Sequence, residues 1–214
     1  YEIASRLVGS GMCKRDRVLA PTGFTRMAHP AGELAVVRAA GRAGIPFTLS
    51  TMGTRSIEEC ASVAPAGARL WFQVYAWRDR DLIRAMVERA AAANFEALCL
   101  TVDTAVLGRR ERDVRRGLTL PPEIGPGTFI DGLRHPGWTW RFLRSDPIRF
   151  ANVEGSDRVR GGPGDGSTAI DLAAYMGSQF DHGLSWKDVE WLRSVWEGPV
   201  LVKGIQTVAD AVLA

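Results

Sequence analysis

Short apolar runs alternate with amphipathic stretches along much of the chain. Five of the apolar runs have the length and composition of buried β-strands, namely residues 18–23, 45–50, 70–75, 96–101 and 199–205. Helical spacing of apolar residues follows most of these runs, so helices are predicted between the strands. Strand and helix in regular alternation are typical of a parallel α/β fold.

The predicted helix over residues 79–93 has the clearest pattern. Its apolar positions share one helical face and are predicted to lie in the core: Leu82, Ile83, Met86, Val87 and Ala90. Two further helices are expected to begin at Ser56 and Ser185, because each serine is followed three residues later by an acidic residue, Glu59 or Asp188, as in a capping box.

The alternation stops between residues 117 and 183, a segment rich in Gly and Pro. An interruption of this length in a compact domain indicates a functional insertion or a disordered one. Trp138 and Trp140 stand there among Arg134, Arg141, Arg144 and Arg149. This mixture predicts a mobile segment that faces an anionic membrane surface or a partner. The alternative is a lid that covers the site and buries its tryptophans.

Five strand-helix units are fewer than the eight that close a (β/α)8 barrel. The chain is therefore expected to be either an open doubly wound sheet or the front part of a TIM barrel. In the barrel interpretation, residues 1–214 form one partial domain covering roughly the first five units, with the 117–183 insertion after the fourth strand. The first residue is Tyr1 rather than Met, which suggests that the chain begins inside a longer protein.

The formal net charge of +3 is mildly basic, and the excess of Arg and Lys lies mostly between residues 109 and 160. This distribution favours anionic ligands or a membrane surface over nucleic acid. Cys13, Cys60 and Cys99 are odd in number and lack metal-ligand spacing, so we expect a reducing compartment and no metal. No leader or membrane-spanning run is visible, and the expected location is cytoplasmic, with a peripheral contact on the inner face of the membrane.

Candidate site residues, most of them polar, stand where the predicted strands end. They are Pro21, Thr22, Gly23, Ser50, Gln73, Tyr75, Thr101, Asp103, Arg110 and Lys203. The carboxyl ends of parallel strands meet at one edge, where ligands bind in α/β folds. Gln73 and Tyr75 are two residues apart and point the same way. Each residue alone also has a structural explanation, such as a hydroxyl bonding the backbone or a lysine pairing with a carboxylate.

The histidines are weaker candidates. His29 stands beside Pro30 at a helix start, and His135 and His182 fall in the insertion. None of them follows a predicted strand in the way that an oriented general base would.

Several motifs together resemble a known family. They are Ala20-Pro-Thr-Gly23, Met27-Ala-His-Pro30, Leu49-Ser-Thr-Met-Gly-Thr54, Phe72-Gln-Val-Tyr75, Leu100-Thr-Val-Asp-Thr104, Leu107-Gly-Arg-Arg110, Ser185-Trp-Lys-Asp188 and Leu201-Val-Lys-Gly204. In this order they resemble the FMN-dependent α-hydroxy acid dehydrogenases and oxidases, which include L-lactate dehydrogenase, glycolate oxidase and mandelate dehydrogenase. The stretch Pro136-Gly-Trp-Thr-Trp140 is more similar to the bacterial lactate dehydrogenases.

The resemblance implies roles for the residues at the strand ends. The flavin would be held by Pro21, Thr22, Gly23, Ser50, Gln73, Thr101 and Lys203. Lys203 would lie where negative charge develops on the reduced flavin, a catalytic role. Tyr75 would act in catalysis and would bind the substrate carboxylate together with Arg110.

The implied activity is oxidation of an L-2-hydroxy acid, lactate-like, to the 2-oxo acid, with quinone, cytochrome or oxygen as final electron acceptor. The family's histidine base lies beyond the matched motifs, so this chain alone is expected to be inactive, and the complete protein is expected to be a homo-oligomer. Two alternatives remain open here: a Schiff-base lyase that uses Lys203, and a non-catalytic flavin-binding or interaction fragment.

Overall fold

The computed structural model describes residues 17–104, 111, 126–153, 179–181 and 183–214. Its centre is a four-stranded sheet of β1 (Phe47–Leu49), β2 (Leu70–Tyr75), β3 (Ala97–Thr101) and β4 (Val200–Lys203). All three strand pairs are parallel, and the order is β1-β2-β3-β4. Sequential order without reversal is that of a barrel wall, whereas a doubly wound sheet reverses at a switch point.

The first predicted strand, over residues 18–23, is reduced to a single parallel bridge between Leu19 and Phe47. The Leu19 amide donates to the Pro46 carbonyl, and the Leu19 carbonyl accepts from the Thr48 amide. Pro21 has no amide hydrogen to continue such a ladder, which accounts for the short pairing.

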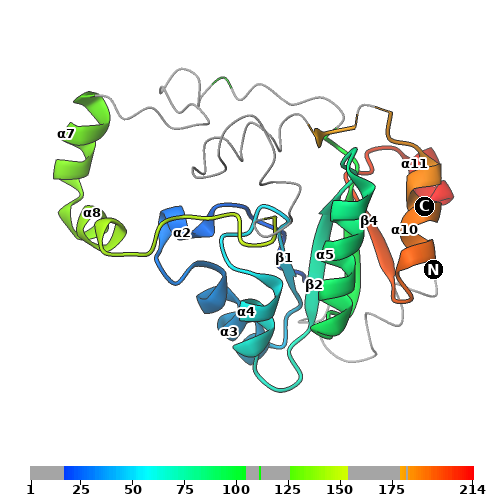
Figure 1. Ribbon diagram of the computed structural model, residues 1–214, viewed down its shortest axis with the longest axis horizontal. Helices are drawn as coiled ribbons and strands as arrows, with labels where there is room; N and C mark the ends of the chain where they lie inside the picture. Colours follow the sequence, from blue (N-terminus) through cyan, green and yellow to red (C-terminus); the bar gives the residue numbers. More distant parts are fainter. Residues whose placement is uncertain (1–16, 105–110, 112–125, 154–178, 182) are drawn as a thin grey trace.

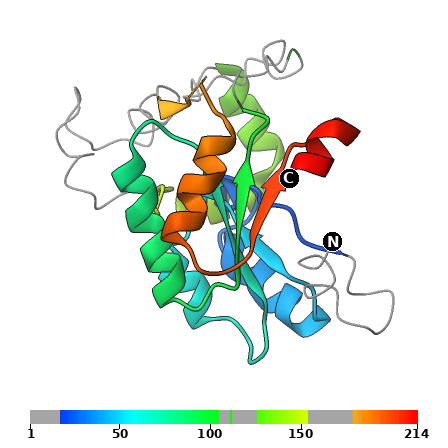
Figure 2. The same cartoon turned by 90° about the vertical axis from the view of Figure 1, so that its right-hand side faces the viewer.

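Helices join and cover the strands (Figure 1). They are α2 (Thr25–Ala28), α3 (Gly32–Ala43), α4 (Ile57–Ser62), α5 (Arg80–Ala92), α10 (Trp186–Val195) and α11 (Val208–Leu213). Figure 2 shows α5 and α10 side by side. Arg80 of α5 joins them by an ion pair with Asp188 of α10, and its guanidinium lies 5.3 Å from the ring centre of Trp191.

Both predicted capping boxes are present. The Ser56 hydroxyl accepts from the Glu59 amide at 3.0 Å, and the Glu59 carboxylate accepts from the Ser56 amide at 2.8 Å. Asp188 accepts from the Ser185 amide at 2.7 Å in the same way. These local bonds satisfy amides that the first turn of a helix leaves without partners.

The core lies between the helices and one face of the strands. All five residues predicted for the buried face of α5 are at most 4% exposed. They pack in one apolar cluster with Leu70, Phe72, Val74, Leu98 and Leu100 of the strands. Because side chains alternate along a strand, the residues between these point to the opposite face. That second face carries Ser50, Gln73 and Thr101.

The described part of the insertion contains two helices, α7 (Pro126–Arg134) and α8 (Pro136–Leu143). Figure 1 shows this α7–α8 hairpin apart from the sheet and next to α2. The Trp138 indole donates to the Met27 carbonyl of α2 at 2.9 Å, which fixes the hairpin to the body. Among the helices that the structure describes, none is both long enough and apolar enough to cross a membrane.

Candidate functional site

Strand register places the candidate residues on one face of the sheet, at two neighbouring levels that together form a strand-end row. Tyr75 of β2 pairs with Thr101 of β3, and Thr101 pairs with Lys203 of β4. Leu49 pairs with Phe72, so Ser50 stands level with Gln73, two residues before Tyr75 along β2. Neighbours in parallel register share a face, and these residues therefore meet at the carboxyl edge of the sheet.

A continuous chain of hydrogen bonds links the side chains of Ser50, Gln73 and Thr101. The Ser50 hydroxyl donates to Gln73 Oε1 at 2.9 Å, and Gln73 Nε2 donates to the Thr101 hydroxyl at 2.8 Å. All three side chains are buried, with at most 3% exposed. Gln73 keeps one amide hydrogen and one carbonyl lone pair after these bonds, and a ligand laid across the row could use them.

The segment that contains Pro21, Thr22 and Gly23 lies against the turn after β1. A Cβ atom on Gly23 would stand 3.1 Å from the Met52 Cβ, and the next amide, that of Phe24, donates to the Met52 carbonyl at 3.3 Å. A glycine therefore lets the two backbone segments approach closely. The Met52 amide donates to the Ser50 hydroxyl at 3.2 Å, so the segment that contains Gly23 forms a wall beside the row.

Lys203 of β4 pairs in register with Thr101 and lies at the end of the row that is farthest from Ser50. Its ammonium is 3.2 Å from the carboxylate of Asp103, and the two side chains are 40% and 35% exposed. Gly204 has φ +105, and a Cβ there would stand 2.7 Å from the Asp103 Cβ. The close passage of these two strand ends sets the positions of both charged groups.

Tyr75 is the last residue of β2, and its side chain is half-buried among aromatic rings. Its ring stacks on Trp77 at 6.3 Å and meets the edge of Phe180 at 5.3 Å. These contacts fix the ring. Arg110, the other predicted carboxylate-binding residue, lies outside the described residues, as does His182.

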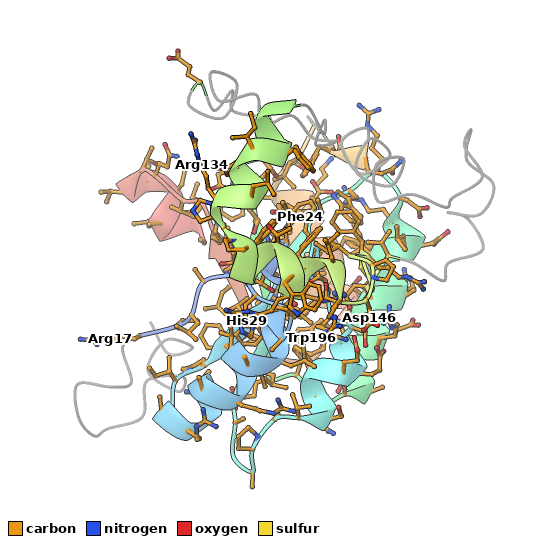
Figure 3. The ribbon with its side chains drawn as sticks, turned by 90° about the vertical axis from the view of Figure 1, so that its left-hand side faces the viewer. Arg17, Phe24, His29, Arg134, Asp146 and Trp196 are labelled. Carbon is orange, nitrogen blue, oxygen red and sulfur yellow. The ribbon has the colours of Figure 1, made fainter. Side chains whose placement is uncertain are left out.

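The two described histidines have other partners. Nδ1 of His29 accepts from the Ala31 amide at 3.2 Å, at the junction of α2 and α3 on the side that carries the hairpin (Figure 3). A ring nitrogen of His135 lies 3.0 Å from the Asp131 carbonyl oxygen in the hairpin. Neither residue belongs to the strand-end row.

The buried cysteines are poor nucleophiles. Burial raises the pKa of the Cys99 thiol to about 11, with Lys203 opposing the shift, and burial also raises the pKa of the Cys60 thiol far above its ordinary value. Both thiols are free, and Cys13 lies outside the described residues. Among the described residues, no group of three or more His, Cys, Asp or Glu side chains could hold a metal ion.

Two buried residues beside the site are not marked by any motif in the sequence. Glu33 of α3 is 1% exposed and accepts from the Thr54 amide at 2.7 Å and from its hydroxyl. Asn152 is 2% exposed and contacts the turn after β1. Glu33 looks like an ordinary helical charge in sequence, and Asn152 lies in a stretch without periodicity, so no sequence signal marks either one.

A surface hollow lined by Asn94, Glu96, Trp196 and Gly198 lies at the opposite, amino-terminal edge of the strands. In barrels, conserved chemistry is found at the carboxyl edge. The hollow is therefore separate from the candidate site.

Comparison with known proteins shows which family the chain resembles. The sequence model of the FMN-dependent dehydrogenase family matches residues 17–214. The chain is 40% identical over 195 residues to an L-lactate dehydrogenase of Pseudomonas aeruginosa, covering 90% of this chain and 49% of the relative. It is 41% identical over 197 residues to glycolate oxidase 1 of Oryza sativa subsp. japonica, covering 92% and 46%.

Solved structures of (S)-mandelate dehydrogenase have the same fold. One, described as a monotopic membrane protein, superposes with a TM-score of 0.80 at 35% identity, covering 91% of this chain and 49% of that chain. A soluble mutant of the membrane-associated enzyme from Pseudomonas putida gives 0.66 at 33% identity, with 91% and 46% covered. This chain therefore spans about half the length of the relatives it matches.

The chain belongs to the FMN-dependent dehydrogenase family. Its parallel sheet is part of a (β/α)8 barrel, and the family's cofactor is FMN. The residues present fit that group. The polar edge of a flavin ring needs neutral donors and acceptors at close spacing, which the buried Ser50, Gln73 and Thr101 side chains supply.

Proposed function

We propose that the native-length protein containing this chain oxidises a lactate-like L-2-hydroxy acid to the 2-oxo acid with FMN. The observation that carries the proposal is the buried Ser50–Gln73–Thr101 chain that ends beside Lys203 at the carboxyl edge of the strands. Relatives named L-lactate dehydrogenase and glycolate oxidase support the substrate class.

In this proposal, the row and the wall beside it hold the cofactor. The side chains of Ser50, Gln73 and Thr101 bind the polar edge of the ring, and the backbone of Pro21, Thr22 and Gly23 lines one side. The packing of Gly23 against Met52 supports a wall that is rigid before the ligand binds.

Lys203 supplies a fixed positive charge. Bound FMN would accept two electrons and thereby gain negative charge, and a preorganised cation beside it stabilises that charge without rearrangement. Asp103 at 3.2 Å orients the ammonium. Tyr75, fixed by Trp77 and Phe180, hydrogen-bonds the substrate carboxylate, and Arg110 is assigned to the same carboxylate from the motif alone.

The reaction also requires a base. The α-hydrogen leaves the substrate carbon together with the electron pair of its C–H bond, and the hydroxyl proton must go to a group within hydrogen-bond reach. His29 and His135 are engaged elsewhere among the described residues. Neither of these two histidines is therefore assigned as the base.

The lyase alternative uses Lys203 as a nucleophile, which requires a neutral amine. In the structure, Lys203 Nζ donates to the Asp103 carboxylate at 3.2 Å, which directs the nitrogen toward a carboxylate rather than toward a substrate carbonyl carbon. This contact supports the oxidoreductase over the lyase.

The decisive experiment mixes the purified native-length protein anaerobically with L-lactate, with (S)-mandelate and with the D-isomers. We expect a flavin spectrum that bleaches with the L-acids and one 2-oxo acid formed per flavin. Borohydride added with a 2-oxo acid should leave Lys203 unmodified. A covalent adduct on Lys203, or a protein that binds FMN and is never bleached, would refute the oxidoreductase.

We further propose that the α7–α8 hairpin contacts an anionic membrane surface. Large apolar side chains are exposed along it, namely Phe129, Ile130, Leu133, Trp138, Trp140, Phe142 and Leu143. Trp138 is 44% and Trp140 58% exposed, which favours a surface contact over a lid with buried tryptophans. Arg134, Arg141 and Arg144 add charge that is complementary to anionic headgroups. The mandelate dehydrogenase relative described as a monotopic membrane protein also supports this contact.

A further inference from the structure

The turn between β1 and α4, residues 50–55, is held by a residue that lies about a hundred positions away in sequence. Asn152 Oδ1 accepts from the Ile57 amide at 2.9 Å. Its amide nitrogen donates to the Ser50 carbonyl at 3.5 Å and to the Arg55 carbonyl at 3.4 Å. The Ile57 amide is a donor, so it fixes which end of the Asn152 side chain faces the helix.

Asn152 is itself fixed by contacts that do not involve the turn. Arg89 of α5 donates to the Asn152 carbonyl at 2.9 Å. Phe150, two residues earlier and fully buried, meets the ring of Phe24 edge-on at 4.9 Å. The side chain therefore reaches the turn from an anchored backbone, and it can impose a position on the turn.

The turn also has bonds of its own that end at the site. The Gly53 amide donates to the Ser50 carbonyl at 2.8 Å, and the Thr51 hydroxyl donates to the Gln73 carbonyl at 2.5 Å. Glu33 of α3 also holds the turn, because its carboxylate accepts from the Thr54 amide. The Ser50 carbonyl thus accepts from both Gly53 and Asn152, while the Ser50 hydroxyl begins the hydrogen-bond chain to Gln73.

We propose that Asn152 is a positioning residue for the cofactor site. By tying the Ser50 and Arg55 carbonyls to the start of α4, it holds Ser50 and Met52 at the spacing that the Gln73 row and the Gly23 wall require. The insertion would thereby have two roles. The buried Asn152 side chain would position the flavin site, and the α7–α8 hairpin would supply an exposed apolar surface. This inference rests on the proposed flavin role of Ser50.

A purely structural role for Asn152 makes a different prediction. Losing a buried, hydrogen-bonded amide would lower the stability of the whole domain and leave the folded site as it was. A positioning role instead weakens FMN binding in molecules that are fully folded. The two are separated by comparing Asn152 variants with a core variant of equal stability loss.

The test uses the native-length protein with Asn152→Ala, Asn152→Asp and the control Val87→Ala, which removes buried methyl groups from α5. FMN affinity is measured by titration well below every unfolding temperature, together with the visible flavin spectrum. Asn152→Ala should weaken FMN binding by about tenfold and shift the flavin bands, because the turn loses all three side-chain bonds. Asn152→Asp, which keeps the acceptor for Ile57, should weaken it as well and provides the measurement if the alanine variant does not fold.

Hydrogen exchange of the FMN-free proteins gives a second readout. Amides in residues 51–57 should exchange faster in the Asn152 variants than in Val87→Ala at matched stability. Unchanged FMN affinity in a folded Asn152 variant, or an equal loss in Val87→Ala, would overturn the inference and leave the proposed function intact. A wild-type protein that binds no FMN would overturn both.

Discussion

Gln73 and Thr101 are joined side chain to side chain by a 2.8 Å hydrogen bond between neighbouring strands, at a depth where both are almost fully buried. Thr101 pairs in register with Lys203, so the same threonine stands between the neutral part of the row and its charged end. A buried amide between two hydroxyl groups is stable only while both partners are present.

Gln73→Leu should therefore destabilise the protein. It keeps an apolar volume in place but leaves the hydroxyls of Ser50 and Thr101 without their shared partner, at a cost of about 1–3 kcal/mol. Urea unfolding of the FMN-free native-length protein measures the change. The triple variant that also carries Ser50→Ala and Thr101→Val should regain part of the loss, and an unchanged midpoint in Gln73→Leu would show that the row is not a stabilising network.

Lys203→Met should slow flavin reduction strongly and change the stability of the fold only slightly. The ion pair with Asp103 is partly exposed and should contribute at most about 1 kcal/mol to stability. The rate of flavin reduction by L-lactate should fall by roughly two orders of magnitude, because a preorganised charge is worth about 3 kcal/mol in the transition state. Stopped-flow bleaching at the wild-type rate would remove the catalytic role.

Much of the fold is visible in the sequence because it depends on local periodicity. The face of α5 and the two capping boxes were predicted residue by residue, since each depends on side chains within one or two turns of helix. The strand-end row was also predictable: parallel strands deliver their carboxyl ends to one edge, so Ser50, Gln73 and Thr101 had to meet.

The contacts between distant segments were not predictable in this way. Arg26 is a charged residue in a short helix, yet it is 5% exposed and donates to the carbonyls of Asp146 and Pro147 after the hairpin. Burial of Glu33 and Asn152 likewise depends on which segment arrives from far along the chain. Periodicity describes the face of one element and contains no information about its distant partner.

Met86→Ala tests the core predicted from the α5 pattern. Met86 is 1% exposed in the main apolar cluster, and truncation should cost about 2–5 kcal/mol. Glu88→Ala, exposed on the same helix, should change stability by less than about 0.5 kcal/mol. Similar unfolding midpoints for the two variants would contradict the burial of that face.

The Glu58–Arg89 pair should make stability depend on pH in acid. The Arg89 guanidinium, by hydrogen bonding, holds the pKa of Glu58 at about 2, below its ordinary 4.5. Because the folded pKa is depressed, the stabilisation is complete above about pH 4.5 and is lost as the pH falls toward 2. Glu58→Gln should flatten the stability profile in that window, measured by urea unfolding at a series of pH values. Since the Glu58 side chain is 53% exposed, added salt should also weaken the effect.

The α7–α8 hairpin provides the last prediction. Trp140 is 58% and Leu143 73% exposed, and the Arg144 guanidinium lies 4.0 Å from the centre of the Trp140 ring. This grouping presents an apolar surface with a cation at its border, as amphipathic helices do at anionic interfaces. The native-length protein should therefore co-sediment with anionic vesicles at low salt and much less with zwitterionic ones.

Variants of the hairpin should weaken this binding in two distinguishable ways. Arg144→Gln should reduce it about fivefold at low salt and little at high salt, since one arginine contributes about 1 kcal/mol near an anionic surface. Trp140→Ala should reduce it at both salt concentrations, because the lost contribution is apolar burial. Trp186→Ala is the matched control, an exposed tryptophan on α10 far from the hairpin in sequence. Failure of the native-length protein to co-sediment at low salt would contradict the membrane contact and favour a lid. Equal losses of binding in the Trp186 and Trp140 variants would show that the hairpin is not the membrane-binding element.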